Sequence, residues 1–155
     1  MQHFVGTFEC KADDKGRIML PMSLKKQLSD KLKNGFVIKR AVFNQCLELY
    51  PIKEWDSLME RINNLNRFNK KNIDFIRRFT AGVRQIDIDI SGRILIPKDL
   101  INHAKIKNNV LFVGLGKTFQ ICEPKNFEKF KSFARKKAFQ NRSNLKWENK
   151  LKGEL

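Results

Sequence analysis

Apolar and polar residues alternate along two stretches of the chain, each followed by a turn and a short apolar run. The apolar members are Phe4, Gly6, Phe8, Cys10 and Ala12 in the first stretch, and Ile86, Ile88 and Ile90 in the second. A period of two is typical of a half-buried strand. The apolar runs 18–20 and 94–96 each end at a proline, which donates no ladder hydrogen bond and is tolerated at a helix start. The pattern predicts strand, turn, strand and helix, twice.

The residues after each proline continue the parallel. Helical spacing is seen at Leu24, Leu28 and Leu32 in the first half, and at Leu100, Ile101 and Ala104 in the second. A turn, a buried strand (36–42; 110–115) and a final strand ending at proline (47–51; 119–124) follow in both halves. We predict two β-hairpins around a short helix in each half.

Longer amphipathic helices follow each half. The first carries Trp55, Leu58, Met59, Ile62 and Leu65, and the second carries Phe127, Phe130, Phe133 and Ala134. A further helical stretch, 73–79, leads into the second half, and the tail 140–155 is polar with Lys146, Lys150 and Lys152. One apolar face opposite a charged face indicates packing against a neighbour. Aromatic residues at this spacing belong to cores more often than to base-stacking surfaces.

An internal repeat underlies both halves. Residues 13–21 read DDKGRIMLP and residues 89–97 read DISGRILIP, at a constant offset of 76. We therefore predict a mainly β, α+β protein with two repeat units (7–54 and 83–126), a helical connector (55–82), and a C-terminal helix with a basic tail (127–155). Units of this size bury little surface alone, so fusion, strand exchange or oligomerisation is expected.

The Asp-x-x-Gly-Arg segment of each repeat reads as a tight turn. Gly16 and Gly92 accept the positive φ that such a turn demands. The aspartates Asp13 and Asp89 can accept backbone N–H groups and hold the arginines Arg17 and Arg93 across the turn. Two interpretations stay open: each pair locks a turn or bridges subunits, or each presents an aimed arginine to nucleic acid, where guanine is the commonest specific partner of arginine.

The charge favours a polyanionic partner. Lys plus Arg total 32 against 16 acidic residues, a formal net charge of +16 with a sequence pI near 10.0. Phosphates neutralised by such residues release counterions, although a generally cationic surface is the alternative. The turns themselves are balanced: 9–17 and 84–93 each hold equal numbers of acidic and basic residues. This balance favours contacts by a few oriented side chains over a general electrostatic attraction to DNA.

Other classes of function find little support. The N-terminus lacks the apolar region of a signal peptide and the apolar runs are too short to span a bilayer, so a cytosolic protein without membrane attachment is expected. Neither the cysteines (Cys10, Cys46, Cys122) nor the histidines (His3, His103) show metal-ligand spacing. No nucleophile–base set, P-loop or GxGxxG stands out, and Asp87 and Asp89 are better read as solvated than as an acid–base pair. We expect no enzyme, cofactor, metal or small-molecule substrate.

The doubled DDKGRIMLP and DISGRILIP, with CLELYPIKEW and FVGLGKTFQICEP, resemble the MraZ family of bacterial regulators over about residues 4–133. The resemblance implies two SpoVT–AbrB-like swapped-hairpin units forming one double-psi-type pseudo-dimeric barrel with flanking helices. It also implies a ring-shaped, octamer-like homo-oligomer in the cytoplasm and nucleoid. Such a ring would bind direct repeats of double-stranded DNA in the promoter of the division and cell-wall gene cluster.

Carried onto this chain, the resemblance makes Arg17 and Arg93 the signature arginines, and Asp13 and Asp89 the signature aspartates. The predicted DNA-binding set is Lys11, Lys15, Arg17, Arg84 and Arg93, and the predicted turn and assembly set is Asp13, Gly16, Asp89 and Gly92. Ser91 replaces the basic residue of the first turn, so the second unit is expected to be the weaker contact or to serve assembly. An antitoxin-like protein-binding module, an RNA-binding protein and a purely structural ring stay as alternatives.

Overall fold

A computed structural model of the chain describes residues 3–28 and 34–140. The chain divides into a first unit, Met1–Pro124, and a second unit, Lys125–Leu155, and each is described by itself. The first unit holds the strands β1 (Thr7–Lys11), β2 (Arg17–Met19), β3 (Phe36–Arg40), β4 (Leu47–Pro51), β5 (Arg84–Ile86), β6 (Arg93–Leu95), β7 (Asn109–Gly114) and β8 (Phe119–Cys122). Its helices are α1 (Met22–Leu28), α2 (Ile52–Asn63), α3 (Lys70–Thr80) and α4 (Lys98–Ala104), and α5 (Pro124–Gln140) supplies the described part of the second unit.

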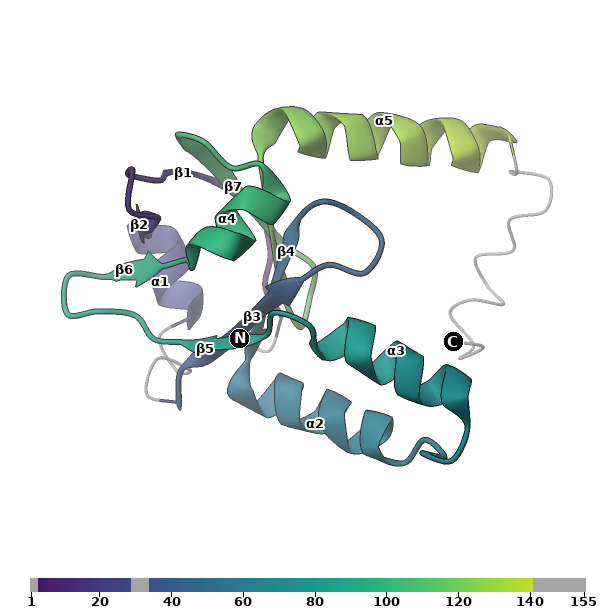
Figure 1. Cartoon of the computed structure of the whole chain (residues 1–155). Helices are drawn as coiled ribbons and strands as arrows, with labels where there is room; N and C mark the ends of the chain where they lie inside the picture. Colours follow the sequence, from purple (N-terminus) through teal and green to yellow (C-terminus); the bar gives the residue numbers. More distant parts are fainter. Residues whose placement is uncertain (1–2, 29–33, 141–155) are drawn as a thin grey trace. The chain divides into compact units, whose positions relative to one another are not determined.

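The strands form two antiparallel sheets (Figure 1). Six strands pair in the order β1-β7-β8-β4-β3-β5, and β2 pairs with β6 in a separate two-stranded ribbon. A single bridge between Ala12 and Ile18 joins β1 to β2. The fold is therefore α+β, as predicted, and its strands lie in two antiparallel sheets. No helix of the described residues is long and apolar enough to cross a membrane.

The repeat units exchange strands. The second hairpin of each unit, β3–β4 or β7–β8, forms as predicted. Of the predicted first hairpin only the turn forms, with the single Ala12–Ile18 bridge in the first repeat, because β1 pairs with β7, β5 pairs with β3, and β2 pairs with β6. Alternation of apolar residues specifies which face of a strand is buried but not which strand lies beside it. A unit of this size buries too little surface to be stable alone, and the exchange of strands buries each unit against the other.

The strand registers reveal a pseudo-twofold axis. In the ribbon, Arg17 lies opposite Leu95 and Met19 lies opposite Arg93, with Ile18 facing Ile94. Adding the repeat offset of 76 to Arg17 gives Arg93, and adding it to Met19 gives Leu95. The repeat therefore relates the pair Arg17–Leu95 to the pair Met19–Arg93. The six-stranded sheet is symmetric in the same way about the central β8–β4 pair. The two Asp-x-x-Gly-Arg turns are therefore equivalent positions on one surface.

One core is shared by both repeats. It contains the inward residues of the ribbon, Ile18 and Ile94, together with apolar residues from six strands and from α1 and α4. Leu24, Leu28, Leu100 and Ala104 are fully buried, which confirms the apolar faces predicted for the short helices. The three cysteines are also buried. Leu32 and the lysines of the tail lie outside the described residues.

Some apolar residues after β5 and in α5 are only partly buried or are exposed. Ile86 is buried, but β5 ends there and Ile90 is fully exposed, because the second turn has already left the sheet. In α5, Phe127 and Phe130 are half-buried and Phe133 is 68% exposed. Their packing against a neighbour stays a prediction.

A buried ammonium group ties the connector helices to the sheet. Lys39 of β3 is 1% exposed, and its Nζ lies 3.2 Å from Oε1 of Glu48 on the neighbouring strand. The same Nζ lies 4.4 Å from the centre of the Phe79 ring of α3, which stacks on Trp55 of α2. Because a buried charge needs a partner, this cluster depends on the Glu48 carboxylate.

Candidate nucleic-acid interface

The first turn is closed by one carboxylate that bonds both backbone and side chain. Asp13 Oδ1 accepts the backbone N–H groups of Lys15 (3.0 Å) and Arg17 (2.9 Å). Asp13 Oδ2 accepts the Arg17 Nε–H at 2.7 Å. The backbone adds hydrogen bonds from Asp13 N to Arg17 O and from Gly16 N to Asp13 O, with Gly16 at φ +84°. The predicted tight turn and positive φ are both confirmed.

The second turn repeats this geometry. Asp89 Oδ1 accepts the Arg93 backbone N–H at 2.8 Å, and Oδ2 accepts the Arg93 Nε–H at 3.0 Å. Gly92 has φ +81° and donates its N–H to the Asp89 carbonyl. The predicted Asp–Arg pairing is therefore present in both repeats with the same atoms.

The electrostatics of the turns follow from these bonds. The backbone N–H of Arg17 and then its guanidinium hold the pKa of Asp13 below its ordinary value. The pKa of Asp89 is lowered by the backbone N–H of Arg93 above all. Both carboxylates are thus ionised near neutral pH, as an ionised acceptor of charge-assisted hydrogen bonds requires.

Each arginine keeps its outer end free. Asp13 and Asp89 engage only the Nε of their arginines, and within the described part of the chain no hydrogen bond is made by either Nη atom of Arg17 or Arg93. The two side chains are 40% and 36% exposed. A guanidinium held at Nε and open at both Nη atoms offers a parallel pair of donors in a fixed direction, the fork that matches two acceptors on a base edge.

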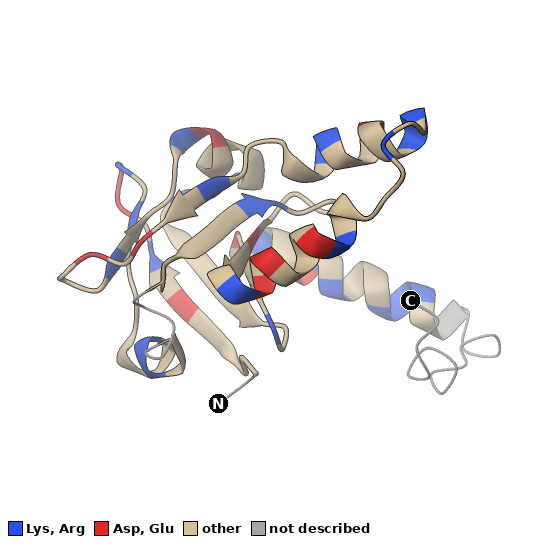
Figure 2. Cartoon of the chain, turned by 90° about the horizontal axis from the view of Figure 1, so that it is seen from below, with Lys and Arg blue, Asp and Glu red and all other residues tan. Residues whose placement is uncertain are grey.

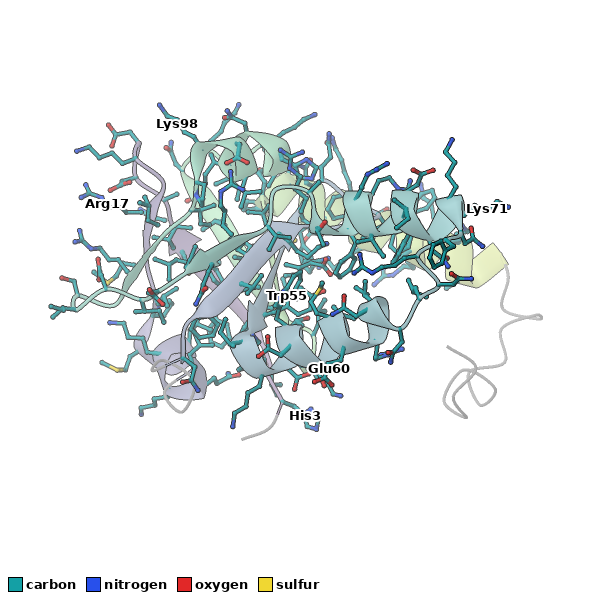
Figure 3. All side chains as sticks on the ribbon, turned by 60° about the horizontal axis from the view of Figure 1, so that its bottom comes forward. His3, Arg17, Trp55, Glu60, Lys71 and Lys98 are labelled. Carbon is teal, nitrogen blue, oxygen red and sulfur yellow. The ribbon has the colours of Figure 1, made fainter. Side chains whose placement is uncertain are left out.

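The outer face of the ribbon alternates arginine with apolar side chains. Ile18 and Ile94 point inward, so Arg17, Met19, Arg93 and Leu95 share the opposite face. Met19 is 50% and Leu95 55% exposed. Figure 2 shows basic and acidic segments together at both turns, in agreement with the charge balance expected from sequence. In Figure 3, Arg17 lies at the opposite end of the first unit from Lys71 on α3.

The short helices cross over to cover the turns of the opposite repeat. The carbonyl of Gly16 accepts the N–H of Ile96, and that of Gly92 accepts the N–H of Leu20. A Cβ atom built at Gly92 would lie only 2.2 Å from Nζ and 2.3 Å from Cε of Lys25 on α1. At Gly16 the equivalent neighbour is Ile101, whose Cγ1 would lie 3.6 Å away. The second turn, which lacks a lysine of its own, thus has the Lys25 ammonium group against it.

The other predicted site residues are not all brought together. Lys15 is exposed at the tip of the first turn, and Lys11, at the end of β1, lines a shallow hollow together with Met19. Arg84 instead lies 3.5 Å from Asp99 of α4 and also contacts the carbonyl of Val83. Sequence reasoning missed Lys25. In the sequence, Lys25 is recognisable only as a charged residue next to the apolar positions of the first short helix. Its place against the second turn follows from the crossing of the two repeats.

Comparison with known proteins agrees with this architecture. The sequence profile of one family, described as "MraZ protein, putative antitoxin-like", matches twice, over residues 3–78 and 79–146. A protein of Flavobacterium psychrophilum named "Transcriptional regulator MraZ" is 57% identical over 129 residues, which cover 83% of this chain and 82% of the relative. Proteins of the same name are 53% identical in Christiangramia forsetii (83% of each chain) and 42% identical in Pelagibacter ubique (94% of each chain). With two profile matches spanning most of its length and relatives of this similarity, the chain belongs to the MraZ family of transcriptional regulators.

Proposed function

We propose that this protein regulates transcription by reading double-stranded DNA with the outer face of the β2–β6 ribbon and its two turns. The observation that carries the proposal is the pair of carboxylate-held arginines, Arg17 and Arg93, related by the pseudo-twofold axis with their Nη atoms open. A two-stranded ribbon is narrow enough to enter the major groove. If the aspartates only locked the turns, nothing would require a long, half-exposed arginine at both positions.

Each group on this face has a chemical partner in DNA. The Nη pair of each arginine fits O6 and N7 of guanine, and the apolar ends of Met19 and Leu95 fit the methyl group of thymine. Lys11, Lys15 and Lys25 border this face and would contact phosphates, which set position and orientation without reading sequence. The net charge of +16 supports binding to a polyanion. Arg84, which pairs with Asp99, is the weakest member of the predicted set.

The second turn is not simply a weaker copy of the first. Its Ser91 takes the position of Lys15, but the Lys25 ammonium group packed on Gly92 returns one positive charge to that turn. We infer that both turns contact DNA and that each brings one lysine, from the loop in the first repeat and from α1 in the second. This revises the expectation of unequal contacts that sequence alone suggested.

We infer the barrel, the assembly and the DNA target from membership of the family. We infer that the ribbon and the six-stranded sheet, joined by the Ala12–Ile18 bridge, build a swapped-hairpin barrel of the double-psi type. The protein would assemble as a ring-shaped, octamer-like homo-oligomer in the cytoplasm and on the nucleoid. There it would bind direct repeats in the promoter of the division and cell-wall gene cluster. Several subunits bound in register to successive repeats gain affinity through effective concentration.

A binding assay tests the proposal. The DNA is the region upstream of the protein's own gene, used intact and with its repeats scrambled, at several salt concentrations. We expect Arg17→Ala and Arg93→Ala each to weaken binding to the intact repeats far more than to the scrambled DNA. Arg77→Ala, on α3 and paired with Asp74, is the matched control and should leave both affinities unchanged. If both ribbon variants match the control, the ribbon is not the interface.

A further inference from the structure

A second cationic site lies apart from the ribbon, where three elements of the first unit end. Arg40 is the last residue of β3, Arg78 lies in the last turn of α3, and His103 lies in the last turn of α4 (Figure 1). Together with Ala41, Val42 and Ala81 they line a hollow of about 210 Å³. None of these residues takes part in the proposed DNA interface.

Two nitrogen atoms of the residues that line this hollow are buried and have no hydrogen-bond partner among the described residues. Arg40 Nε and His103 Nε2 have no hydrogen bond within the described part of the chain. Leaving a buried polar atom unsatisfied destabilises the fold, so native proteins nearly always provide a partner. The arginine Nε is always a donor, and the partner that it lacks is therefore an acceptor.

The surrounding charge is also unbalanced. Arg40 Nη2 and Arg84 Nη2 share one carboxylate, Asp99, at 3.8 and 3.5 Å. No ion pair of Arg78 is found among the described residues, whereas its neighbour Arg77 lies 3.7 Å from Asp74. Three guanidinium groups thus have one carboxylate between them, which favours an additional anion at this place.

The pseudo-twofold axis supplies an internal comparison. The equivalent of His103 in the first repeat is Gln27, 76 residues earlier, and its side chain bonds both the N–H and the carbonyl of Val5. The equivalent of Arg40 on β7 is Gly114, 74 residues later, and Phe4 backbone atoms lie 2.7 Å from where a Cβ atom would be. At the place formed by Gln27 and Gly114, then, the chain's own backbone fills the space. At the equivalent place the space is open, and the glycine and glutamine are replaced by Arg40 and His103.

We propose that the hollow formed by Arg40, Arg78 and His103 is a binding site for a small oxyanion of the phosphate class. Arg40 Nε and the Arg78 guanidinium donate to its oxygens, and His103 provides a third contact. The volume lies below the roughly 300–1,000 Å³ of pockets for drug-sized ligands, so the site suits a phosphate-sized group and not a nucleotide. Burial, and then the charge of Arg40, lower the pKa of His103, and a bound anion opposes both effects.

The chain offers a direct readout because it contains only two histidines, His3 and His103. Inorganic phosphate is titrated into the full chain without DNA, at constant pH and ionic strength made up with chloride, while NMR follows both imidazole rings. A His103→Gln variant assigns the signals. We expect saturable shifts of His103 alone and a higher His103 pKa in phosphate than in chloride.

Two variants complete the test. Arg78→Gln removes an exposed guanidinium without opening the core, and should weaken phosphate binding roughly tenfold or more, as loss of a charged hydrogen bond does. Arg77→Gln, one residue away, should bind phosphate as the parent does. The proposal is overturned if His103 does not respond, if both histidines shift alike, if Arg77→Gln weakens binding as much as Arg78→Gln, or if acetate at equal ionic strength acts as strongly as phosphate.

Discussion

The two turn glycines provide a sharp test of the crossed arrangement of the repeats. Gly16 and Gly92 have nearly the same backbone conformation, with φ of +84° and +81°, so alanine carries the same conformational penalty at both sites, about 1–2 kcal/mol. What differs is the neighbour of the added methyl group. At Gly16 it would lie 2.6 Å from the carbonyl oxygen of Ile96, and at Gly92 it would meet the end of the Lys25 side chain.

These neighbours predict unequal losses of stability. The backbone N–H of Ile96 donates to the Gly16 carbonyl. Gly16→Ala must therefore move the two backbone segments apart and weaken that hydrogen bond. We expect a total loss of about 2–4 kcal/mol in the free energy of unfolding, from the φ penalty plus about 1–2 kcal/mol for the displaced hydrogen bond. In Gly92→Ala the flexible lysine swings away, and the loss stays near about 1–2 kcal/mol.

Urea unfolding of both variants at one protein concentration measures the difference. Gly92→Ala should in addition lose DNA affinity, because the displaced Lys25 no longer lies against the second turn. Equal losses of stability would refute the crossed packing that distinguishes the two sites. Full retention of DNA affinity by Gly92→Ala would refute the role given to Lys25.

Three further predictions concern charge. Because Asp13 has a lowered pKa in the fold, its contribution to stability is present above its unfolded pKa and is lost as pH falls through the lower folded value. Acidification from pH 5 to pH 3 should therefore cost the parent more stability in urea than it costs Asp13→Asn. Lys25→Gln should reduce the slope of log affinity against log salt by about 1 for every subunit that contacts DNA, whereas Lys71→Gln at the far end of the unit should not. Glu48→Ala should destabilise by about 3 kcal/mol by leaving the buried Lys39 ammonium group without its counter-ion, and Lys39→Met should cost much less; equal costs in urea unfolding would show that the ion pair does not govern this cluster.

The local structure of this protein could largely be predicted from its sequence. The period-two stretches, the prolines and the doubled turn predicted nearly every strand and helix, because these features act within a few residues of each other. The Asp–Arg pairing was also predictable, since its members lie four positions apart in a turn that brings them together.

Partnership between distant segments could not be predicted in the same way. Nothing in the alternation around Phe8 specifies β7 as the partner of β1, because that choice depends on how two whole units bury each other. Lys25 could be related to Gly92 only after the helix was seen to cross the pseudo-twofold axis. Arg84 was predicted from sequence to bind DNA, and its ion pair with Asp99, fifteen residues away on α4, could not be predicted from that pattern. The orphaned nitrogens of Arg40 and His103 likewise emerge only from packing.

Arg17→Lys tests most directly whether the carboxylate-held arginines read DNA sequence. Lysine keeps the positive charge but lacks the planar fork. The measurement is the ratio of affinities for intact and scrambled upstream repeats, by fluorescence anisotropy at fixed salt. We predict that this ratio falls roughly 5- to 150-fold for each guanine that no longer has a bidentate arginine partner, while affinity for scrambled DNA is nearly unchanged. An unchanged ratio would contradict the account and reduce Arg17 to a phosphate-binding residue.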